Sequence, residues 1–278
     1  MRWIARGVAL FAVLVALACA AVYGGSSWAL GRHYAVRASQ VAVPSDAASI
    51  AEGARMARVA SCRDCHGMNG QGKVFFEAPM VGRLAPPALA RVAATMSDAD
   101  LVNAIRHGVH KDGTSLYVMP VRALSHLSDE DVGRIVAWIR TLKPQPGDSL
   151  ATTQFGLGGR AMLLAGKLLP VATERDAAAA RAPADRGEYI VEIGCMACHK
   201  LREPSATDDG IKVPPLAPMA AAYDPAAFRR LLSTGESMSG RDLGVMRMVG
   251  RDSYGALTDQ EVAQVQAYLT RVALRADP

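Results

Sequence analysis

Two cysteines and a histidine lie within five residues of one another at two places in this chain. The sequences are CRDCH at residues 62–66 and CMACH at residues 195–199. These residue types at this spacing allow three chemistries. They could form a tetrahedral zinc site, a thiol redox pair, or two thioether bonds to a haem whose iron takes the imidazole.

The surroundings of the two motifs separate these chemistries. A redox CxxC normally follows a strand in a βαβ pattern, whereas both motifs here lie between segments of helical periodicity. A zinc site built from the four cysteines would leave the adjacent histidines without a role. Haem attachment uses every residue of the motif, so we predict two covalently bound haem c groups. The predicted thioether cysteines and iron-binding histidines are Cys62, Cys65, His66, Cys195, Cys198 and His199.

An internal repeat predicts the second axial ligand of each iron. After each motif a helical segment ends at a glycine, Gly108 or Gly235, and another glycine follows five residues later. From there Met119 aligns without a gap on Met246, and methionine sulfur is a common sixth ligand of haem iron. The distance to the last helix favours Met248 instead. We follow the upstream alignment and keep Met248 as the alternative.

Paired prolines follow both motifs at similar distances. A backbone carbonyl at Pro87 or Pro215 could accept the free N–H of the axial histidine and so fix the ring. Turn formation explains the same prolines equally well.

The helices that must position these residues also repeat. One helical segment leads into each motif, a second is capped by Ser97 or Asp224, and a last amphipathic one follows Ser128 or Thr258. Half of the residues are hydrophobic and only 5% are aromatic, a composition typical of Ala- and Leu-rich helices. We therefore predict an all-α fold.

The N-terminus predicts export. Arg2 and Arg6 precede an uninterrupted apolar run at residues 7–23, and positive charge before such a run places the N-terminus inside. We expect an uncleaved single-pass anchor in a bacterial inner membrane, with the rest of the chain in the periplasm. A signal peptide cleaved after residues 16–18 and lipoprotein processing at Cys19 are the alternatives.

The predicted domains follow from these patterns. They are a signal-anchor helix at 1–30, a first module at 44–146, a linker with a short helix at 147–184, and a second module at 185–278. The apolar segment at 156–170 is expected to pack across the two modules, with contact to the membrane surface as the alternative.

Charge argues against a nucleic-acid partner. The net charge is +5, and residues 1–43 alone contribute four arginines and no acidic residue. No basic stripe is left for the body of the protein.

The motifs CRDCHG…PP…MP…LSDEDVGRIVAWIRTL and CMACHK…PP…GVM…LTDQEVAQVQAYL resemble the class I cytochrome c family twice over. One departure is Lys200, where the first copy has a glycine. The resemblance implies crossed terminal helices around a haem crevice with His66 and His199 as proximal ligands and Met119 and Met246 as distal ligands.

The tandem layout is similar to membrane-bound dihaem cytochromes c of respiratory chains. It implies an electron carrier, not an enzyme, because two six-coordinate irons leave no position for a substrate. The implied partners are membrane-bound or periplasmic redox proteins: a dehydrogenase, a quinol-oxidising complex or a terminal oxidase. A dihaem peroxidase or a thiosulfate-oxidising cytochrome, with one catalytic haem, is the alternative.

Overall fold

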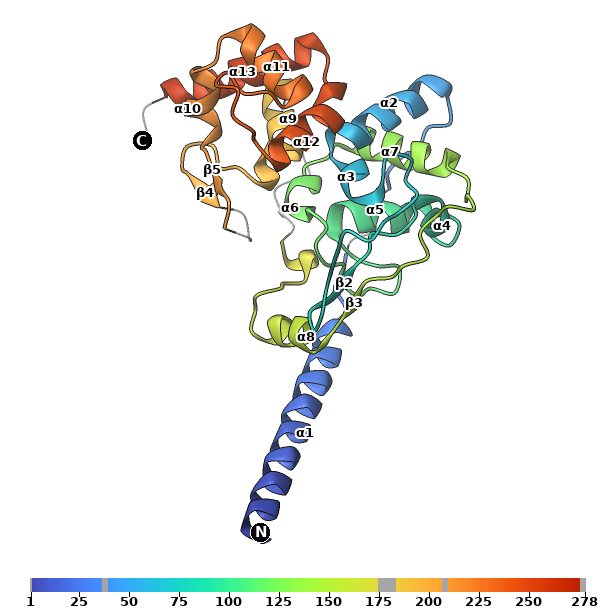
Figure 1. Ribbon diagram of the computed structural model, residues 1–278. Helices are drawn as coiled ribbons and strands as arrows, with labels where there is room; N and C mark the ends of the chain where they lie inside the picture. Colours follow the sequence, from blue (N-terminus) through green and yellow to red (C-terminus); the bar gives the residue numbers. More distant parts are fainter. Residues whose placement is uncertain (1, 37–39, 175–183, 207–209, 276–278) are drawn as a thin grey trace.

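The computed structural model describes residues 2–36, 40–174, 184–206 and 210–275. A long N-terminal helix, α1 (Arg2–Leu30), extends away from two helical modules that lie against each other (Figure 1). This helix is long and apolar enough to cross a bilayer, and other parts of the described chain do not cover its apolar stretch. Parts of three predicted segments lie outside the described residues: residue 1 of the anchor, 175–183 of the linker, and 207–209 and 276–278 of the second module.

The first module consists of α2 (Ala47–Val59), α3 (Cys62–His66), β1 (Phe76–Ala78), β2 (Gly82–Leu84), α4 (Leu89–Ala93), α5 (Asp98–His107), α6 (Val121–Leu124) and α7 (Asp129–Thr141). The second consists of α9 (Arg186–Ile193), η2 (Cys195–Ala197), β4 (Ser205–Ala206), β5 (Lys212–Val213), α10 (Leu216–Ala221), α11 (Pro225–Thr234), α12 (Val245–Asp252), η3 (Tyr254–Ala256) and α13 (Asp259–Leu274). The connecting segment carries β3 (Gln154–Phe155), α8 (Leu157–Leu164) and η1 (Val171–Thr173).

The predicted helical fold is confirmed, with two small sheets added. β1, β2 and β3 form one antiparallel sheet, and β4 pairs with β5. Strands of two or three residues are too short to show the alternation by which a strand is recognised in a sequence. The predicted N-caps all accept a backbone N–H at the start of their helices, and these caps are Ser97, Ser128, Asp224 and Thr258.

Each module is built on a close crossing of its first and last helices. In the first module, a Cβ placed on Gly53 of α2 would lie 1.9 Å from the carbonyl oxygen of Arg134 in α7. In the second, a Cβ on Gly187 of α9 would lie 2.2 Å from the carbonyl oxygen of Gln264 in α13. Only glycine permits this backbone-to-backbone approach, so the repeat extends to the packing of the helices.

The connecting helix α8 packs on the end of α1 and on the β2–β3 pair (Figure 1). We expected it to span the two modules, and the structure corrects this. The N-terminal glycines of this segment dock on the hairpin backbone: a Cβ on Gly156 would lie 2.4 Å from the Met80 carbonyl oxygen, and one on Gly159 would lie 2.2 Å from that of Val81.

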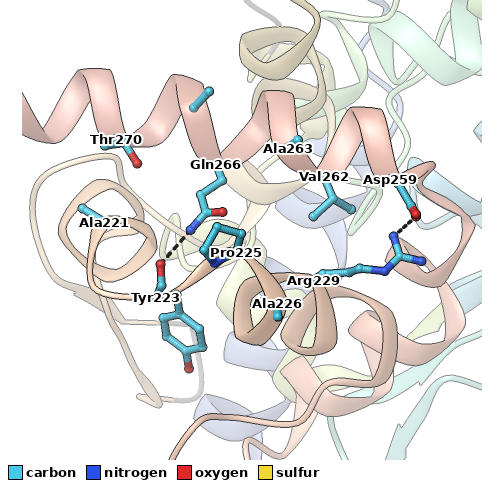
Figure 2. Close-up of a pocket in the computed structure, with 11 residues that line it drawn as sticks. Ala221, Tyr223, Pro225, Ala226, Arg229, Asp259, Val262, Ala263, Gln266 and Thr270 are labelled. Atoms are coloured by element: carbon cyan, nitrogen blue, oxygen red, sulfur yellow. Dashed lines mark hydrogen bonds and ion pairs between the residues drawn. The ribbon is translucent and has the colours of Figure 1, made fainter.

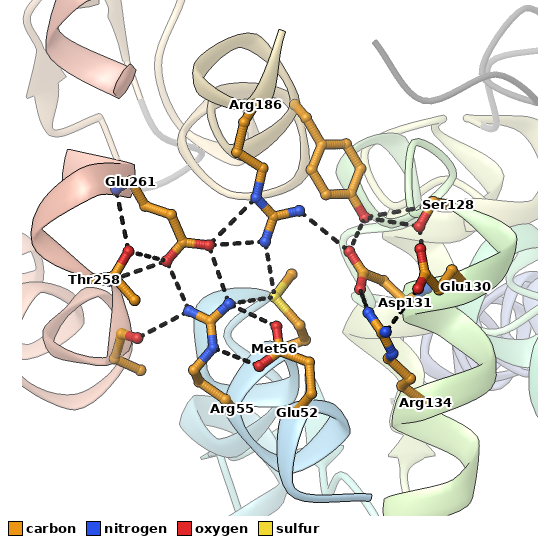
Figure 3. Close-up of polar contacts among 12 residues, drawn as sticks. Glu52, Arg55, Met56, Ser128, Glu130, Asp131, Arg134, Arg186, Thr258 and Glu261 are labelled. Atoms are coloured by element: carbon orange, nitrogen blue, oxygen red, sulfur yellow. Dashed lines mark hydrogen bonds and ion pairs between the residues drawn. The ribbon is translucent and has the colours of Figure 1, made fainter. Parts of the chain in front are cut away.

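The two modules are held together by carboxylates shared between arginines (Figure 3). Arg55 of the first module donates to both carboxylate oxygens of Glu261 at 2.7 and 3.0 Å. Arg186 donates to the same carboxylate at 2.8 Å and lies 3.5 Å from the Asp131 carboxylate. The Tyr189 hydroxyl also donates to Asp131, at 2.7 Å. Two buried carboxylates therefore fix the orientation of one module against the other.

The ionisation of Glu261 makes this interface sensitive to acid. Burial raises the pKa of the carboxyl, but hydrogen bonds from Arg55, the Thr258 backbone and Arg186 outweigh burial and lower the pKa from 4.5 to about 2. A lowered pKa in the folded state contributes stability that is fully present above pH 4.5 and is lost as the pH falls towards 2. The contribution is on the order of 3 kcal/mol.

We predict that Glu261→Gln weakens the pH dependence of the free energy of unfolding between pH 4.5 and 2. Between pH 4.5 and 2 the free energy of unfolding of the wild type should fall by about 3 kcal/mol more than that of the variant, since the amide does not titrate. Guanidinium denaturation followed by circular dichroism at a series of pH values measures the difference. Glu236→Gln, at an exposed carboxylate, is the control. Parallel profiles for wild type and Glu261→Gln would contradict the prediction.

Candidate cofactor sites

The first CxxCH motif forms a single helical turn, α3. It begins after Ser61, whose φ of +57° turns the chain out of α2. At its end the ring nitrogen Nδ1 of His66 lies 2.9 Å from the carbonyl oxygen of Pro87. A carbonyl only accepts, so Nδ1 carries the proton and Nε2 keeps its lone pair. Burial lowers the pKa of His66, which favours the same neutral ring. His66 is thus prepared to bind a metal through Nε2.

The second motif reaches the same arrangement with a tighter turn. Residues Cys195–Ala197 form a 3-10 turn closed by the Cys198 backbone N–H, which donates to the Cys195 carbonyl at 3.3 Å, and the His199 N–H donates to the same carbonyl at 3.0 Å. His199 Nδ1 lies 2.9 Å from the carbonyl oxygen of Pro214, and burial lowers the pKa of this ring as well. The carbonyl at Pro87 is thus the one the sequence pointed to, whereas in the second module Pro214, not Pro215, makes the contact.

The register of the following helix explains this correction. In both modules the accepting carbonyl belongs to the residue before the helix N-cap. Pro87 precedes Ala88, the cap of α4, and Pro214 precedes Pro215, the cap of α10. The Pro215 carbonyl is already used by the first turn of α10, where the Met219 N–H donates to it at 3.4 Å. The alignment of the prolines in the sequence does not show at which residue α4 or α10 begins.

The thiols of both motifs are protonated, with Cys62, Cys65 and Cys195 half-buried and Cys198 exposed. Burial raises the pKa of Cys62 to about 12 and that of Cys195 to about 11, and it also raises the pKa of Cys65 and Cys198. A redox-active CxxC has a lowered thiol pKa, so these pairs do not resemble one. Within the described ranges, no three His, Cys, Asp or Glu side chains lie close enough together to hold a metal ion, as a pooled zinc site would require.

The candidate methionines differ in how they meet the core. Met119 and Met246 are half-buried and pack against core residues, as do Cys62 and Cys195. Met248 is 40% exposed. Because α12 is helical, two residues along it turn by about 200°, so Met246 and Met248 lie on nearly opposite sides of the helix. This geometry favours Met246.

Left-handed backbone precedes both of these methionines. Val118, directly before Met119, has a φ of +72°, and Gly244, two residues before Met246, has a φ of +56°. A β-branched residue in this region is strained by about 1–3 kcal/mol, and such strain gathers at functional sites. Nothing in the sequence around Val118 predicts this positive φ.

One dipeptide of the second module touches both motifs. The Ser253 hydroxyl donates to both carboxylate oxygens of Asp64, inside the first motif, at 2.9 Å. The hydroxyl of the next residue, Tyr254, lies beside Cys195 of the second motif and acts on the pKa of its thiol. Ser253 is fully buried and Tyr254 nearly so. The two candidate sites therefore adjoin a single interface, which no local pattern in the sequence indicates.

The groove drawn in Figure 2 lies away from these residues. It has a volume of about 740 Å³ and runs between α11 and α13 on the second module, where Gln266 donates to the Tyr223 carbonyl at 2.8 Å and Arg229 pairs with Asp259. It contains none of the motif residues.

Comparison with known proteins assigns a family model to each module. Residues 48–139 match the model described as cytochrome c oxidase, cbb3-type, subunit III, and residues 184–273 match the cytochrome c model. Over 261 residues the chain is 27% identical to the fructose dehydrogenase cytochrome subunit of Gluconobacter japonicus. The match covers 82% of this chain and 54% of that protein, so the chain spans about half the length of this curated relative.

The Pro87 carbonyl that holds the His66 ring belongs to a segment packed closely against Gly72, and this packing can be tested by substitution of Gly72. Gly72 has a φ of +71°, and a Cβ on it would lie 2.6 Å from the Ala88 nitrogen and 2.8 Å from the Pro87 carbonyl carbon. Gly72→Ala should therefore lower the free energy of unfolding by about 2 kcal/mol more than Gly240→Ala. Gly240 has a similar φ of +69° but open space around it, so the control carries only the backbone strain. Equal losses in guanidinium denaturation would show that the close approach has no energetic weight.

Proposed function

With two cytochrome c domains in tandem, this chain is a cytochrome c-type protein, and we propose that it is a membrane-anchored dihaem electron carrier. The observation that carries the proposal is the single dipeptide, Ser253 and Tyr254, that contacts both CxxCH motifs. Two redox centres that adjoin one buried interface suit transfer of electrons from one module to the other.

The residues present fit a covalently bound haem in each module. Each motif offers two thiols on one turn and a histidine with a free Nε2. A haem c supplies an iron that takes up and gives back one electron. Cys62 and Cys65 would hold the first group and Cys195 and Cys198 the second, and the remaining proposed ligands are His66, Met119, His199 and Met246.

The protein's own groups would set how these ligands behave. The carbonyls of Pro87 and Pro214 fix the histidine tautomer and ring orientation, which keeps Nε2 unprotonated. Methionine opposite histidine favours the reduced iron and raises its potential. Glu261 pairs with arginines from both modules and so holds the modules that carry the two sites together.

We place the haem modules in the periplasm of a bacterial inner membrane, with α1 retained as the anchor. Trp3 and Trp28 are exposed and lie 25 residues apart on α1, about 38 Å at 1.5 Å per residue, which matches the two interfaces of a bilayer. Arg160 of α8 contacts Tyr23 and Ser26, which would remain in the chain after cleavage at residues 16–18. The proposal that α1 is retained therefore rests on its length and its two tryptophans.

The partner we propose is a membrane-bound dehydrogenase that delivers electrons to this chain. The support is the likeness to a dehydrogenase cytochrome subunit together with the N-terminal anchor. A quinol-oxidising complex or a terminal oxidase would then be the acceptor.

Substitution of the two candidate methionines in α12 tests the sixth ligand of the second iron. Met246→Ala should halve the methionine–iron charge-transfer absorbance of the oxidised protein, because one of two such bonds is lost. Met248→Ala, on the other side of the helix, should leave it unchanged. The reverse result would assign Met248.

Redox titration of the full-length protein tests the carrier function. We expect two reversible one-electron steps and no turnover of hydrogen peroxide, because both irons carry six ligands. Rapid peroxide turnover by the wild type would instead support the dihaem peroxidase class. Absence of haem absorbance from the purified protein would contradict both.

A further inference from the structure

An exposed apolar surface surrounds the point where α1 enters the first module. We call it the foot surface, and it consists of Met80 (65% exposed), Met162 (40%), Leu164 (47%) and Leu169 (52%). Met80 comes from the turn between β1 and β2, and the others come from α8 and the loop after it. In the rest of the first module, most apolar side chains of this size are buried in its core.

The foot surface is attached directly to α1. The Arg160 guanidinium donates to the Ser26 hydroxyl at 2.9 Å and lies 4.7 Å from the centre of the Tyr23 ring. Leu164 packs on the bare backbone of Gly25, where a Cβ would lie 3.4 Å from the leucine side chain. Residues 23–26 of α1 thus fix the height at which α8 lies (Figure 1).

That height coincides with the edge of a bilayer. A helix crosses the hydrocarbon core in about 20 residues. Counted from Gly7, where the uninterrupted apolar run begins, such a span ends at Ser26, and the exposed Trp28 follows two residues later. A helix packed against residues 23–26 therefore lies at the headgroup level, where partly apolar surface is stable.

The hairpin turn is held at the same level. The backbone N–H of Gly158, in the first turn of α8, donates to the Met80 carbonyl at 2.8 Å, and Gly156 N–H donates to the Val81 carbonyl at 3.0 Å. Lys167, which follows α8, is exposed and available to anionic headgroups. Apolar side chains with a nearby lysine match an anionic lipid surface in chemistry as well as in position.

We propose that the foot surface rests on the bilayer and gives the first module a second membrane contact beside α1. This contact would hold the two modules in one orientation relative to the membrane, which a single helix alone does not. The inference rests on the proposed role of α1 as a retained anchor, but it does not depend on which groups bind the irons.

Methionine oxidation tests the proposal with controls inside the chain. The full-length protein is placed in nanodiscs of phosphatidylcholine and phosphatidylglycerol, exposed to hydroxyl radicals, and analysed by mass spectrometry. Exposure alone ranks the oxidation rates as Met80 above Met238 above Met162, because Met238 in the second module is 50% exposed. We expect Met80 and Met162 to react at least fivefold more slowly than Met238. Met80 reacting as fast as Met238 or faster would overturn the proposal.

A charged variant separates lipid contact from other protection. Lys167→Glu combined with Leu169→Glu should raise the oxidation rates of Met80 and Met162 at least threefold, since carboxylates leave an anionic surface. Leu274→Glu, at an 80% exposed leucine of the second module, should leave them unchanged. Protection that persists in the double variant, or that occurs in native membranes but not in nanodiscs, assigns the foot surface to a protein partner and overturns the proposal.

Two further measurements distinguish failure of the second membrane contact from failure of the proposed function. Resistance of the protein to carbonate washing reports insertion of α1, and the visible spectrum reports the haem groups. If both are normal while Met80 is unprotected, only the second membrane contact fails. If carbonate extracts the protein or the spectrum is absent, the anchor or the carrier function fails instead.

Discussion

The hydrogen bond between a backbone carbonyl and Nδ1 of each motif histidine is the constraint on which both sites depend. It fixes the proton on one ring nitrogen and leaves the other for a metal. The carbonyl is available because it belongs to the residue just outside a helix, whose own first turn uses the next carbonyl. The start of a short helix thus decides the chemistry of a side chain elsewhere in the fold.

The two modules use the same bond but differ around it. The first closes its motif as an α-helical turn and packs Gly72 against the proline segment, whereas the second uses a 3-10 turn. Both modules nevertheless build their core on a glycine at the crossing of the first and last helices. The repeat is therefore conserved in packing where it has diverged in local geometry, and the two modules match two different family models.

Charge and burial then join the modules into one unit. Glu261 is shared by Arg55 and Arg186, and Ser253 donates a hydrogen bond to the half-buried carboxylate of Asp64. Burial raises the pKa of Asp64, so without the serine this carboxylate would be a costly group to bury. The same interface that stabilises the pair also brings the two motifs to neighbouring positions, which suits the electron transfer between modules that we propose.

The sequence by itself determined the motifs, the paired methionines, the helix caps and the helical fold, because each depends on spacing along a few turns of chain. The contact between the Pro87 carbonyl and the motif histidine could also be predicted from the sequence. Only the tertiary structure decided that Pro214 replaces Pro215, that Val118 is strained, and that α8 packs on α1. It alone joined Asp64 to Ser253, 189 residues away. Such contacts depend on where helices begin and on which surfaces meet, and no local pattern records either.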